Sequence, residues 1–180
     1  EKHGFWKKAE KISLWPCFVE KKGYQVPLPT EFTFGYIGQL EEHKGIRQLV
    51  GAFKSYKDQN TRLFIAGRGN LAPWIAYEAK KNSRITFFGE YRQDQLETLF
   101  SQISVLVVPS LIRDNMPTVI LESFAHGHPV IGPPLGGFPE ILGYKIDSQR
   151  YCYSNRIGNG GKDREKGELD SHKMHDQGRE

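Results

Sequence analysis

The stretch ISVLVVPSLIRDNMPTVILESFAHGHPVI, residues 103–131, is the most informative part of the sequence. Its apolar beginning, Ile103 to Val108, predicts a buried strand that ends at Pro109-Ser110. Pro117 suits the first position of a helix, where the missing N–H group of proline costs nothing. The acids Asp114 and Glu122 bracket this junction between loop and helix. Because a helix N-terminus attracts anions and carboxylates accept hydroxyl donors, the stretch predicts a sugar nucleotide as ligand.

The same alternation of apolar runs and helical patterns extends on both sides of this stretch. Each predicted strand ends on residues that allow a close turn or a close ligand, namely Gly38, Gly67, Gly89, Pro109-Ser110 and Gly132. We therefore expect five βα repeats with right-handed crossovers, an α/β fold with a Rossmann-like, doubly wound, open parallel sheet. Ligands of such sheets lie beyond the carboxyl ends of the strands. The expected strands are Phe32–Ile37, Leu63–Ala66, Ile85–Phe88, Val105–Val108 and Val130–Ile131, with helices near 46–56, 71–81, 96–103 and 138–142 and one beginning at Pro117.

Length and composition are those of one globular domain with flanking segments. Residues 1–31 read as a linker or N-terminal extension, residues 32–150 as the Rossmann-like domain, and residues 151–180 as a polar, disordered tail. The chain begins without Met, so we expect it to be part of a longer protein.

Charge and cysteine usage narrow the class of partners. The net charge is +4, and nothing resembles a nucleic-acid recognition module, so no nucleic-acid partner is expected. Basic residues near the N-terminus favour a solvated face or peripheral association with an anionic membrane. Cys17 and Cys152 have neither metal-site nor redox spacing, which predicts reduced thiols in the cytoplasm, at most at the cytoplasmic face of the membrane.

The spacing Asp114-x7-Glu122, with Ala125-x-Gly127-x-Pro129-Val130-Ile131 after it, resembles the donor-site signature of the retaining family 4 glycosyltransferases. Further landmarks between Phe34 and Ile141 stand in the family's order: Gly38, Lys44-Gly45, Ile65-Ala66-Gly67-x-Gly69, Ile85-x-Phe87-x-Gly89, Val108-Pro109-Ser110 and Gly136-Gly137-Phe138-Pro139-Glu140. The resemblance implies the C-terminal, donor-binding half of a GT-B architecture. It also implies a nucleoside-diphosphate sugar as donor, a carbohydrate or lipid-linked acceptor, retention of anomeric configuration, no metal or cofactor, and a separate N-terminal half as partner.

Carried over residue by residue, the resemblance gives Glu122 the ribose hydroxyls and Lys44 the donor diphosphate. Lys44 and Asp114 would be the catalytic pair, with Asp114 standing where the family usually has glutamate, against the donor sugar. Gln39 stands where the family has an arginine, so one phosphate-binding cation is missing. The remaining donor-binding residues implied by the resemblance are Gly38, Gly67, Arg68, Tyr91, Asn115, Met116, Pro117, Thr118 and Val119.

Each of these residues also has a structural interpretation. Asp114 is equally suited to cap the helix that begins near Pro117. Lys44 and Tyr91 can be ordinary surface residues, and Glu122 can be a solvated helix residue. His126 and His128 have a spacing that straddles a helix end, so we expect structural or surface histidines and no metal pair.

Two alternative functions remain open. Gly67-x-Gly69-x-x-Ala72, with Glu90 about twenty residues on, fits the fingerprint of an NAD(P)-binding Rossmann domain of an oxidoreductase. The chain can also be a non-catalytic subunit that binds sugar nucleotides. In the glycosyltransferase interpretation the chain alone is expected to bind donor but to transfer its sugar poorly.

Overall fold

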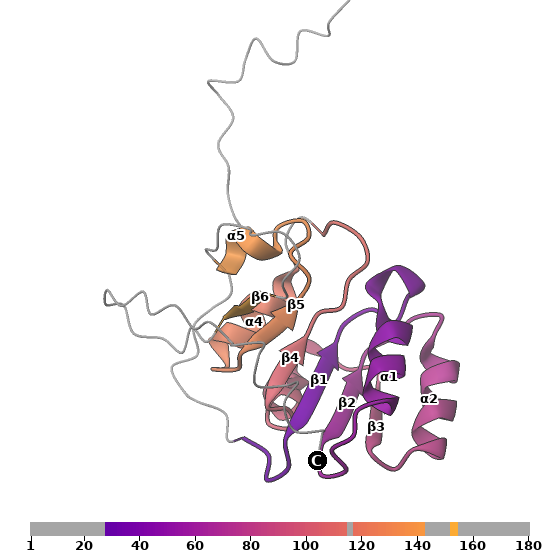
Figure 1. Cartoon of the computed structure of the whole chain (residues 1–180). Coiled ribbons are helices and arrows are strands. Elements are labelled where there is room, and N and C mark those ends of the chain that lie inside the picture. The colour runs from indigo at the N-terminus through magenta and orange to yellow at the C-terminus, as the bar shows by residue number, and fades with distance from the viewer. Residues whose placement is uncertain (1–27, 115–116, 143–151, 155–180) are drawn as a thin grey trace, which may run out of the picture.

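The structure is a computed structural model that describes residues 28–114, 117–142 and 152–154 (Figure 1). Its strands are β1 (Thr33–Ile37), β2 (Arg62–Ala66), β3 (Ile85–Gly89), β4 (Val105–Val107), β5 (Val130–Gly132) and β6 (Cys152–Ser154). Its helices are α1 (Ile46–Lys54), α2 (Ala72–Lys81), α3 (Leu96–Phe100), α4 (Thr118–Ala125) and α5 (Phe138–Leu142), with short 3-10 turns η2 (Glu42–Lys44) and η3 (Gln93–Gln95). None of the helices in these ranges is long and apolar enough to cross a membrane.

The strands form one sheet in the order β3-β2-β1-β4-β5-β6. The first five are parallel, which confirms the predicted Rossmann-like α/β fold. The chain leaves β1 for β2 on one side and returns to β4 on the other, so the strand order reverses between β1 and β4. Ligands of open parallel sheets bind at such a switch point, beyond the carboxyl ends of the strands.

The strand β6 differs from expectation. It pairs antiparallel with β5, through Cys152 opposite Gly132 and Ser154 opposite Val130. These three residues fall in the segment 151–180, which is predicted to be a mostly disordered tail; the strand is an ordered exception within it. The physical reason is that β5 would otherwise present a row of unpaired N–H and C=O groups at the sheet edge. The rest of that segment and the N-terminal extension up to residue 27 lie outside the described residues.

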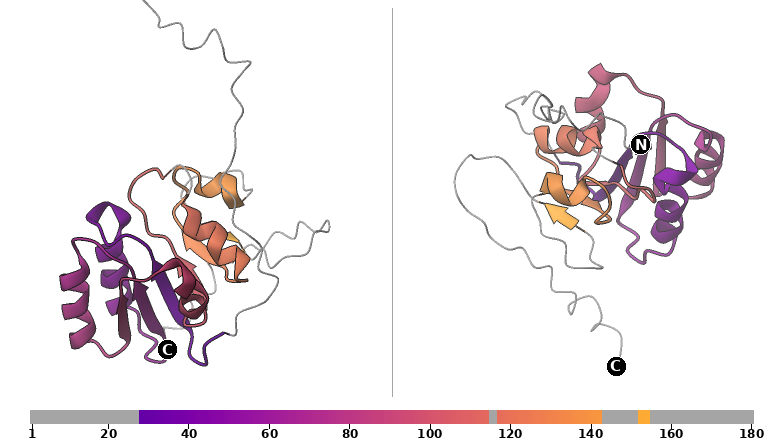
Figure 2. Two further views of the ribbon diagram at one scale, coloured as in Figure 1. Left: turned by 180° about the vertical axis from the view of Figure 1, so that it is seen from behind. Right: turned by 90° about the horizontal axis from the view of Figure 1, so that it is seen from above.

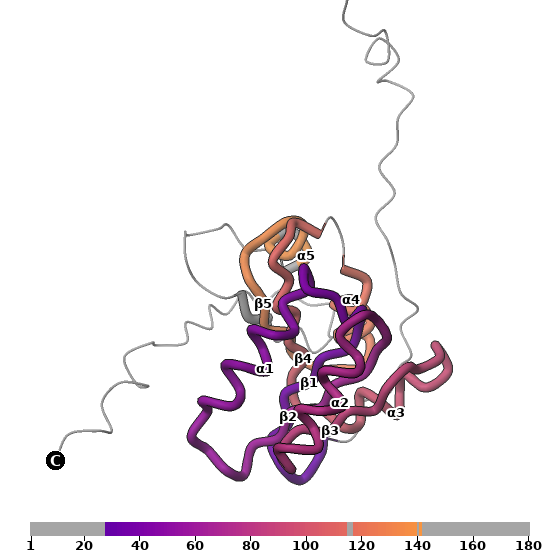
Figure 3. Tube along the Cα trace, turned by 90° about the vertical axis from the view of Figure 1, so that its right-hand side faces the viewer, coloured from indigo at the N-terminus to yellow at the C-terminus, as the bar shows by residue number. Residues whose placement is uncertain are grey.

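Two hydrophobic clusters hold the helices on opposite faces of the sheet (Figures 2 and 3). On one face Ile46, Val50 and Phe53, which are spaced by one helical turn, turn the same side of α1 toward β1 and β2, and Ile75 of α2 joins them. On the other face Leu99 and Phe100 of α3 pack with Ile120 of α4. Burial on both faces explains the near-continuous apolar runs from which the strands are predicted.

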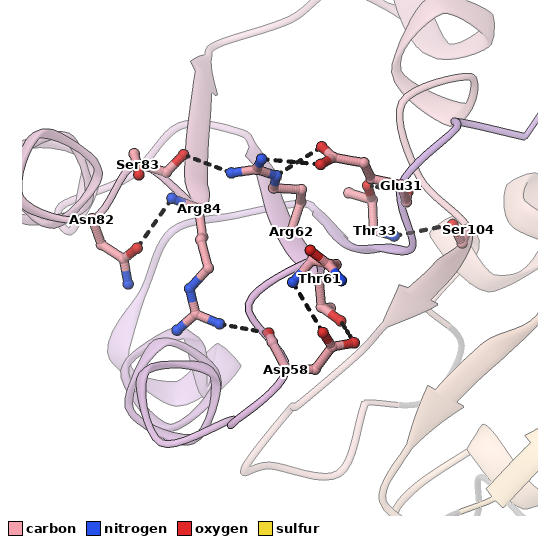
Figure 4. A network of polar contacts seen from close by, with 10 residues as sticks. Glu31, Thr33, Asp58, Thr61, Arg62, Asn82, Ser83, Arg84 and Ser104 are labelled. Carbon is pink, nitrogen blue, oxygen red and sulfur yellow. Dashed lines mark hydrogen bonds and ion pairs between the residues drawn. The ribbon is translucent and has the colours of Figure 1, made fainter.

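A polar network ties together the loops that precede the strands (Figure 4). The Arg62 guanidinium donates to both Glu31 carboxylate oxygens, at 2.8 and 3.0 Å. This hydrogen bond holds the pKa of Glu31 below its usual value. The Ser104 hydroxyl accepts from the Thr33 N–H at 3.0 Å, and Arg84 donates to the Asp58 carbonyl at 2.9 Å. The network fastens the amino edge of the sheet, opposite the edge where a ligand is expected.

Candidate functional site

The carboxyl edge of the sheet carries two adjoining cavities of about 560 and 340 Å³. Their walls are the loops that follow β1, β2, β3 and β4, together with the beginning of α4. The larger cavity is lined by Tyr36, Ile37, Gly38, Gln39, Lys44, Tyr91, Gln93, Val107, Val108, Pro109, Ser110, Asp114, Pro117, Thr118, Val119 and Glu122. The smaller is lined by Gly38, Gln39, Gly67, Arg68, Glu90, Tyr91 and Gln93. The site thus lies at the switch point between β1 and β4, as the fold requires.

Lys44 ends the short turn η2, and its position depends on Gly45. The backbone of Gly45 adopts φ +74°, a left-handed conformation that favours glycine. A Cβ at this position would overlap the carbonyl oxygen of Pro109, at the end of β4. The loop is further fixed by the Leu111 N–H, which donates to the His43 carbonyl at 2.9 Å. Gly45 therefore lets the loop after β1 lie directly on the loop after β4.

Lys44 and Asp114 form a two-point ion pair inside the larger cavity. The Lys44 ammonium lies 3.0 Å from one Asp114 oxygen and 2.8 Å from the other. The Ser110 hydroxyl, which has a single proton, lies within donating distance of the Asp114 carboxylate at 3.1 Å and of the Ile112 carbonyl at 3.2 Å. Among the described residues that line this cavity, Lys44 is the one Lys or Arg.

The beginning of α4 corrects two expectations. The helix begins at Thr118, with Pro117 before it as N-cap in an extended conformation, so Pro117 is not the first helical residue. The Pro117 carbonyl accepts from the Ile120 N–H at 3.1 Å, as an N-cap carbonyl does. Within the described residues, the Asp114 carboxylate makes no hydrogen bond to a backbone N–H of α4 and is turned toward Lys44 instead. The first N–H groups of a helix have no acceptor within it, and here they belong to Thr118 and Val119, which line the cavity.

Glu122 lies one turn further along α4, on the wall of the same cavity. Its carboxylate accepts a hydrogen bond from the Gln93 amide at 3.2 Å. Burial, reinforced by the Glu122 charge, raises the pKa of the neighbouring Tyr91 hydroxyl. Tyr36, on β1, is buried and donates to the Gln39 carbonyl, and burial raises the pKa of its hydroxyl as well. The phenols therefore stay protonated, as neutral hydrogen-bonding groups, near neutral pH.

The smaller cavity is lined by Gly67, the first glycine of the alternative dinucleotide fingerprint. A Cβ at Gly67 would overlap the Gly38 carbonyl, so this glycine is needed where two loops of the chain meet. The Leu40 N–H donates to the Arg68 carbonyl at 2.8 Å and joins the same loops. Glu90 pairs with Arg68 at 2.9 Å, both side chains being mostly exposed. The glycine spacing thus has a cause in the packing of the protein itself.

The structure brings together all the predicted site residues that it describes. Eleven line the two cavities, and Asn115 and Met116 lie outside the described residues. Sequence reasoning missed Tyr36 and Gln93, and it noted Ser110 only as the end of a strand. Gln93 follows the predicted strand end Gly89 by four residues, and this position at the carboxyl edge is the signal that could have drawn attention to it.

His126 and His128 are buried in the turn between α4 and β5. Both imidazoles stack on the Phe100 ring, with centroids 4.5 and 5.6 Å away. The His126 ring nitrogen Nδ1 lies 2.7 Å from the Glu122 carbonyl, at the end of α4. Burial and the adjacent His126 lower the pKa of His128 to about 4. Within the described ranges, no cluster of three or more His, Cys, Asp or Glu side chains could hold a metal ion.

The fold and the cavity define a Rossmann-like α/β domain with a polar site at the carboxyl edge of its sheet. The model of the family "Glycosyl transferases group 1" matches residues 31–152. The chain belongs to this family.

The chain matches only part of the length of its relatives. It is 30% identical over 116 residues to an uncharacterized glycosyltransferase of Methanocaldococcus jannaschii, a match that covers 62% of this chain and 30% of that protein. A lipopolysaccharide outer core galactosyltransferase, WaaB, superposes with a TM-score of 0.62 and 20% identity, covering 74% of this chain and 40% of that one. The HepE protein of Anabaena, in complex with UDP-glucose, superposes with a TM-score of 0.55 and 19% identity, and the match covers 63% of this chain and 32% of that one. The chain therefore spans well under two thirds of the length of each relative.

Proposed function

We propose that the chain is the donor-binding half of a GT-B glycosyltransferase, with a nucleoside-diphosphate sugar bound in the carboxyl-edge cavity. The observation that carries the proposal is the convergence, in one cavity, of the Lys44 cation, the Asp114 and Glu122 carboxylates and the beginning of α4. A cation and helix N–H groups suit phosphate, whereas carboxylates suit hydroxyl groups. The site offers both kinds of partner to one elongated ligand.

Each group has a role that follows from its chemistry. Lys44 would neutralise the negative charge that grows on the diphosphate as the bond to the sugar breaks. Glu122, held by Gln93, would accept hydrogen bonds from the ribose hydroxyls. Tyr91 lies between the two cavities, where the nucleotide base would stack. Retention of configuration follows the family resemblance, and the diphosphate itself would take the acceptor proton, so no side chain of this chain is assigned as a base.

The partners of the reaction are inferred from the partial match, since the chain covers well under two thirds of the length of each relative. The acceptor, a carbohydrate or a lipid-linked sugar, would bind to an N-terminal GT-B half. The HepE complex with UDP-glucose makes a UDP-sugar the first donor to test. A cytoplasmic location, with peripheral attachment to the inner face of the membrane, is part of the same proposal.

The thermal-shift screen described below also tests two other functions. The family match and the packing role of Gly67 weigh against an NAD(P)-binding domain. A non-catalytic subunit that binds sugar nucleotides would share the site but not the chemistry.

A thermal-shift screen tests the proposal. The chain is heated with UDP-, GDP- and ADP-sugars and, separately, with NAD. At a ligand concentration of about one hundred times Kd, binding stabilises the folded state by about 2.7 kcal/mol, which is several degrees in Tm. We expect one class of nucleotide sugar to raise the Tm, and Lys44→Met to abolish the rise. Lys54→Met is the matched control, because Lys54 pairs with Glu78 on the helices away from the cavity. A rise with NAD alone, or no rise with any sugar nucleotide, would contradict the proposal.

A further inference from the structure

The strongest polar contact in the cavity joins the two residues that the proposed function assigns to different parts of the donor. Lys44 would hold the diphosphate and Asp114 the sugar, yet they hold each other at 2.8 and 3.0 Å. About a quarter of each side chain is exposed, 23% for Lys44 and 24% for Asp114, so the pair is only partly screened by water. In this arrangement the charge of Lys44 is already neutralised by Asp114 before a ligand enters.

The Asp114 carboxylate is held in this position from several sides. The hydroxyl of the buried Ser110 lies within donating distance of it, at 3.1 Å, and the Asp114 backbone carbonyl accepts from the Gly137 N–H at 2.8 Å. The Asp114 N–H donates to the Ile112 carbonyl at 3.1 Å. The pairing with Lys44 is therefore a built arrangement of the loop after β4.

We infer that the Lys44–Asp114 pair is a latch, which the donor diphosphate opens by displacing the Asp114 carboxylate from Lys44. The inference rests on the proposed function and adds a step to it. Because both oxygens of the carboxylate lie at the ammonium, an entering anion meets a cation that Asp114 already neutralises, and it competes with that carboxylate for the Lys44 charge. The displaced carboxylate is then available to the hydroxyls of the donor sugar.

The charges of the possible ligands give the latch its selectivity. A carboxylate carries one negative charge, whereas a diphosphate carries more charge and presents more oxygens. A diphosphate bound at Lys44 would also be within reach of the N–H groups at the beginning of α4. An uncharged sugar gains nothing from Lys44 and leaves the pair closed. Asp114 thus makes sugar recognition conditional on a diphosphate.

The latch predicts that removal of a carboxylate from the site improves binding. Isothermal titration compares inorganic pyrophosphate, UDP, GDP and ADP as ligands of the chain and of Asp114→Asn. Asparagine keeps the size of the side chain but cannot form the ion pair, so we expect the Kd for pyrophosphate and for the bound nucleotide to fall roughly fivefold or more. Ser110→Ala, which removes one hydrogen bond to the carboxylate, should change Kd in the same direction by less.

Two controls separate the latch from a general effect of charge. Glu42→Gln removes one negative charge two residues from Lys44, but Glu42 pairs with Arg47 at 2.7 Å, so its Kd should stay within about twofold of the wild type. In a Lys44→Met background, where binding is expected to be lost, Asp114→Asn should not restore it, because the carboxylate then has no cation to withhold.

Three results would overturn the inference. If the wild type binds a probe and the Kd of Asp114→Asn is unchanged or higher, the latch is refuted and the proposed function stands. An equal gain from Asp114→Asn in the wild-type and Lys44→Met backgrounds shows general repulsion and refutes the latch as well. If neither the wild type nor any variant binds any of the four probes, the proposed function fails and the latch fails with it.

Discussion

Lys44 and Glu122 face the same cavity with different partners, and this difference decides how each responds to change. Lys44 has a charged partner, Asp114, whose carboxylate lies 2.8 Å from the ammonium. Glu122 has a neutral partner, the Gln93 amide, which orients the carboxylate but leaves its charge uncompensated. A ligand that opens the proposed latch would break an ion pair at one end of the cavity and would find an oriented acceptor at the other.

The role of Gln93 gives a prediction at the residue scale. Gln93→Leu removes the hydrogen bond to Glu122, so the affinity for the bound ribonucleoside diphosphate should fall roughly threefold to tenfold. The loss should be smaller for the 2′-deoxyribonucleotide, because that ligand lacks one of the hydroxyls that Glu122 would accept. Isothermal titration with both nucleotides measures the difference. Gln59→Leu, at an exposed position after α1, is the control, and equal losses for the two nucleotides would contradict a role in orienting Glu122.

The turn η2 and helix α1 meet at Gly45, where a single Cβ would push the loop after β1 away from β4. Gly45→Ala should lower the free energy of unfolding by about 2 kcal/mol or more, because the left-handed backbone and the contact with Pro109 are both lost. Ligand binding should weaken with it, since Lys44 precedes Gly45. Urea unfolding measures the change.

Gly51→Ala in the same helix is the matched control. A Cβ at Gly51 meets nothing within 4 Å, so alanine should stabilise α1 by about 0.5–1 kcal/mol. Similar effects of the two substitutions would show that Gly45 does not set the loop.

The turn between α4 and β5 gives a prediction about pH. An unfolded chain protonates His128 near pH 6.5, but the folded chain does so only near pH 4, so the unfolded state binds more protons between these values. The free energy of unfolding should fall by about 3 kcal/mol as the pH drops through this window. Urea titrations at several pH values measure the fall.

His128→Gln should flatten this dependence, because it removes the buried titrating group. His43→Gln, at an exposed position in η2, should leave the dependence as in the wild type. A wild-type stability that stays constant from neutral pH to about pH 4.5 would show that His128 is not held neutral by burial.

At the scale of the whole molecule, the parallel sheet could be predicted because burial on both faces leaves a visible trace in the sequence. The runs Leu63–Ala66 and Val105–Val108 are apolar throughout, and each is closed by a residue that ends a strand. The order of the strands then brings the loops of Lys44 and Asp114 to the same edge.

What could not be predicted depends on contacts between distant parts of the chain. The Lys44–Asp114 pair joins residues 70 positions apart, and nothing near Asp114 shows whether it will cap a helix or meet a lysine. No apolar run in the sequence predicts the strand β6. Its place in the sheet depends on backbone pairing with β5, which leaves no such pattern. Pro117 was misplaced by one residue, since a proline serves equally well just before or at the first turn of a helix.

The size of the chain leads to a prediction about activity. Because it spans 30% of its archaeal relative, the chain should bind donor but transfer the sugar poorly or not at all. Addition of a matching N-terminal half, as a separate polypeptide or a fusion, should restore transfer. A radiolabelled-sugar transfer assay measures both. Full turnover by the 180 residues alone would contradict the division of labour between two halves.

An NMR titration of the ¹⁵N-labelled chain with the nucleotide sugar selected by the thermal screen tests the central claim most directly. If the donor binds at the carboxyl edge of the sheet, the largest changes in amide chemical shift should occur at Gly38, Lys44, Gly67, Tyr91 and Thr118, which line the two cavities. The amide signals of Arg62 and Arg84, in the network at the amino edge, should not shift. Shifts centred on the amino edge, or none in the cavities at saturating ligand, would contradict the assignment of this site as the place where the donor binds.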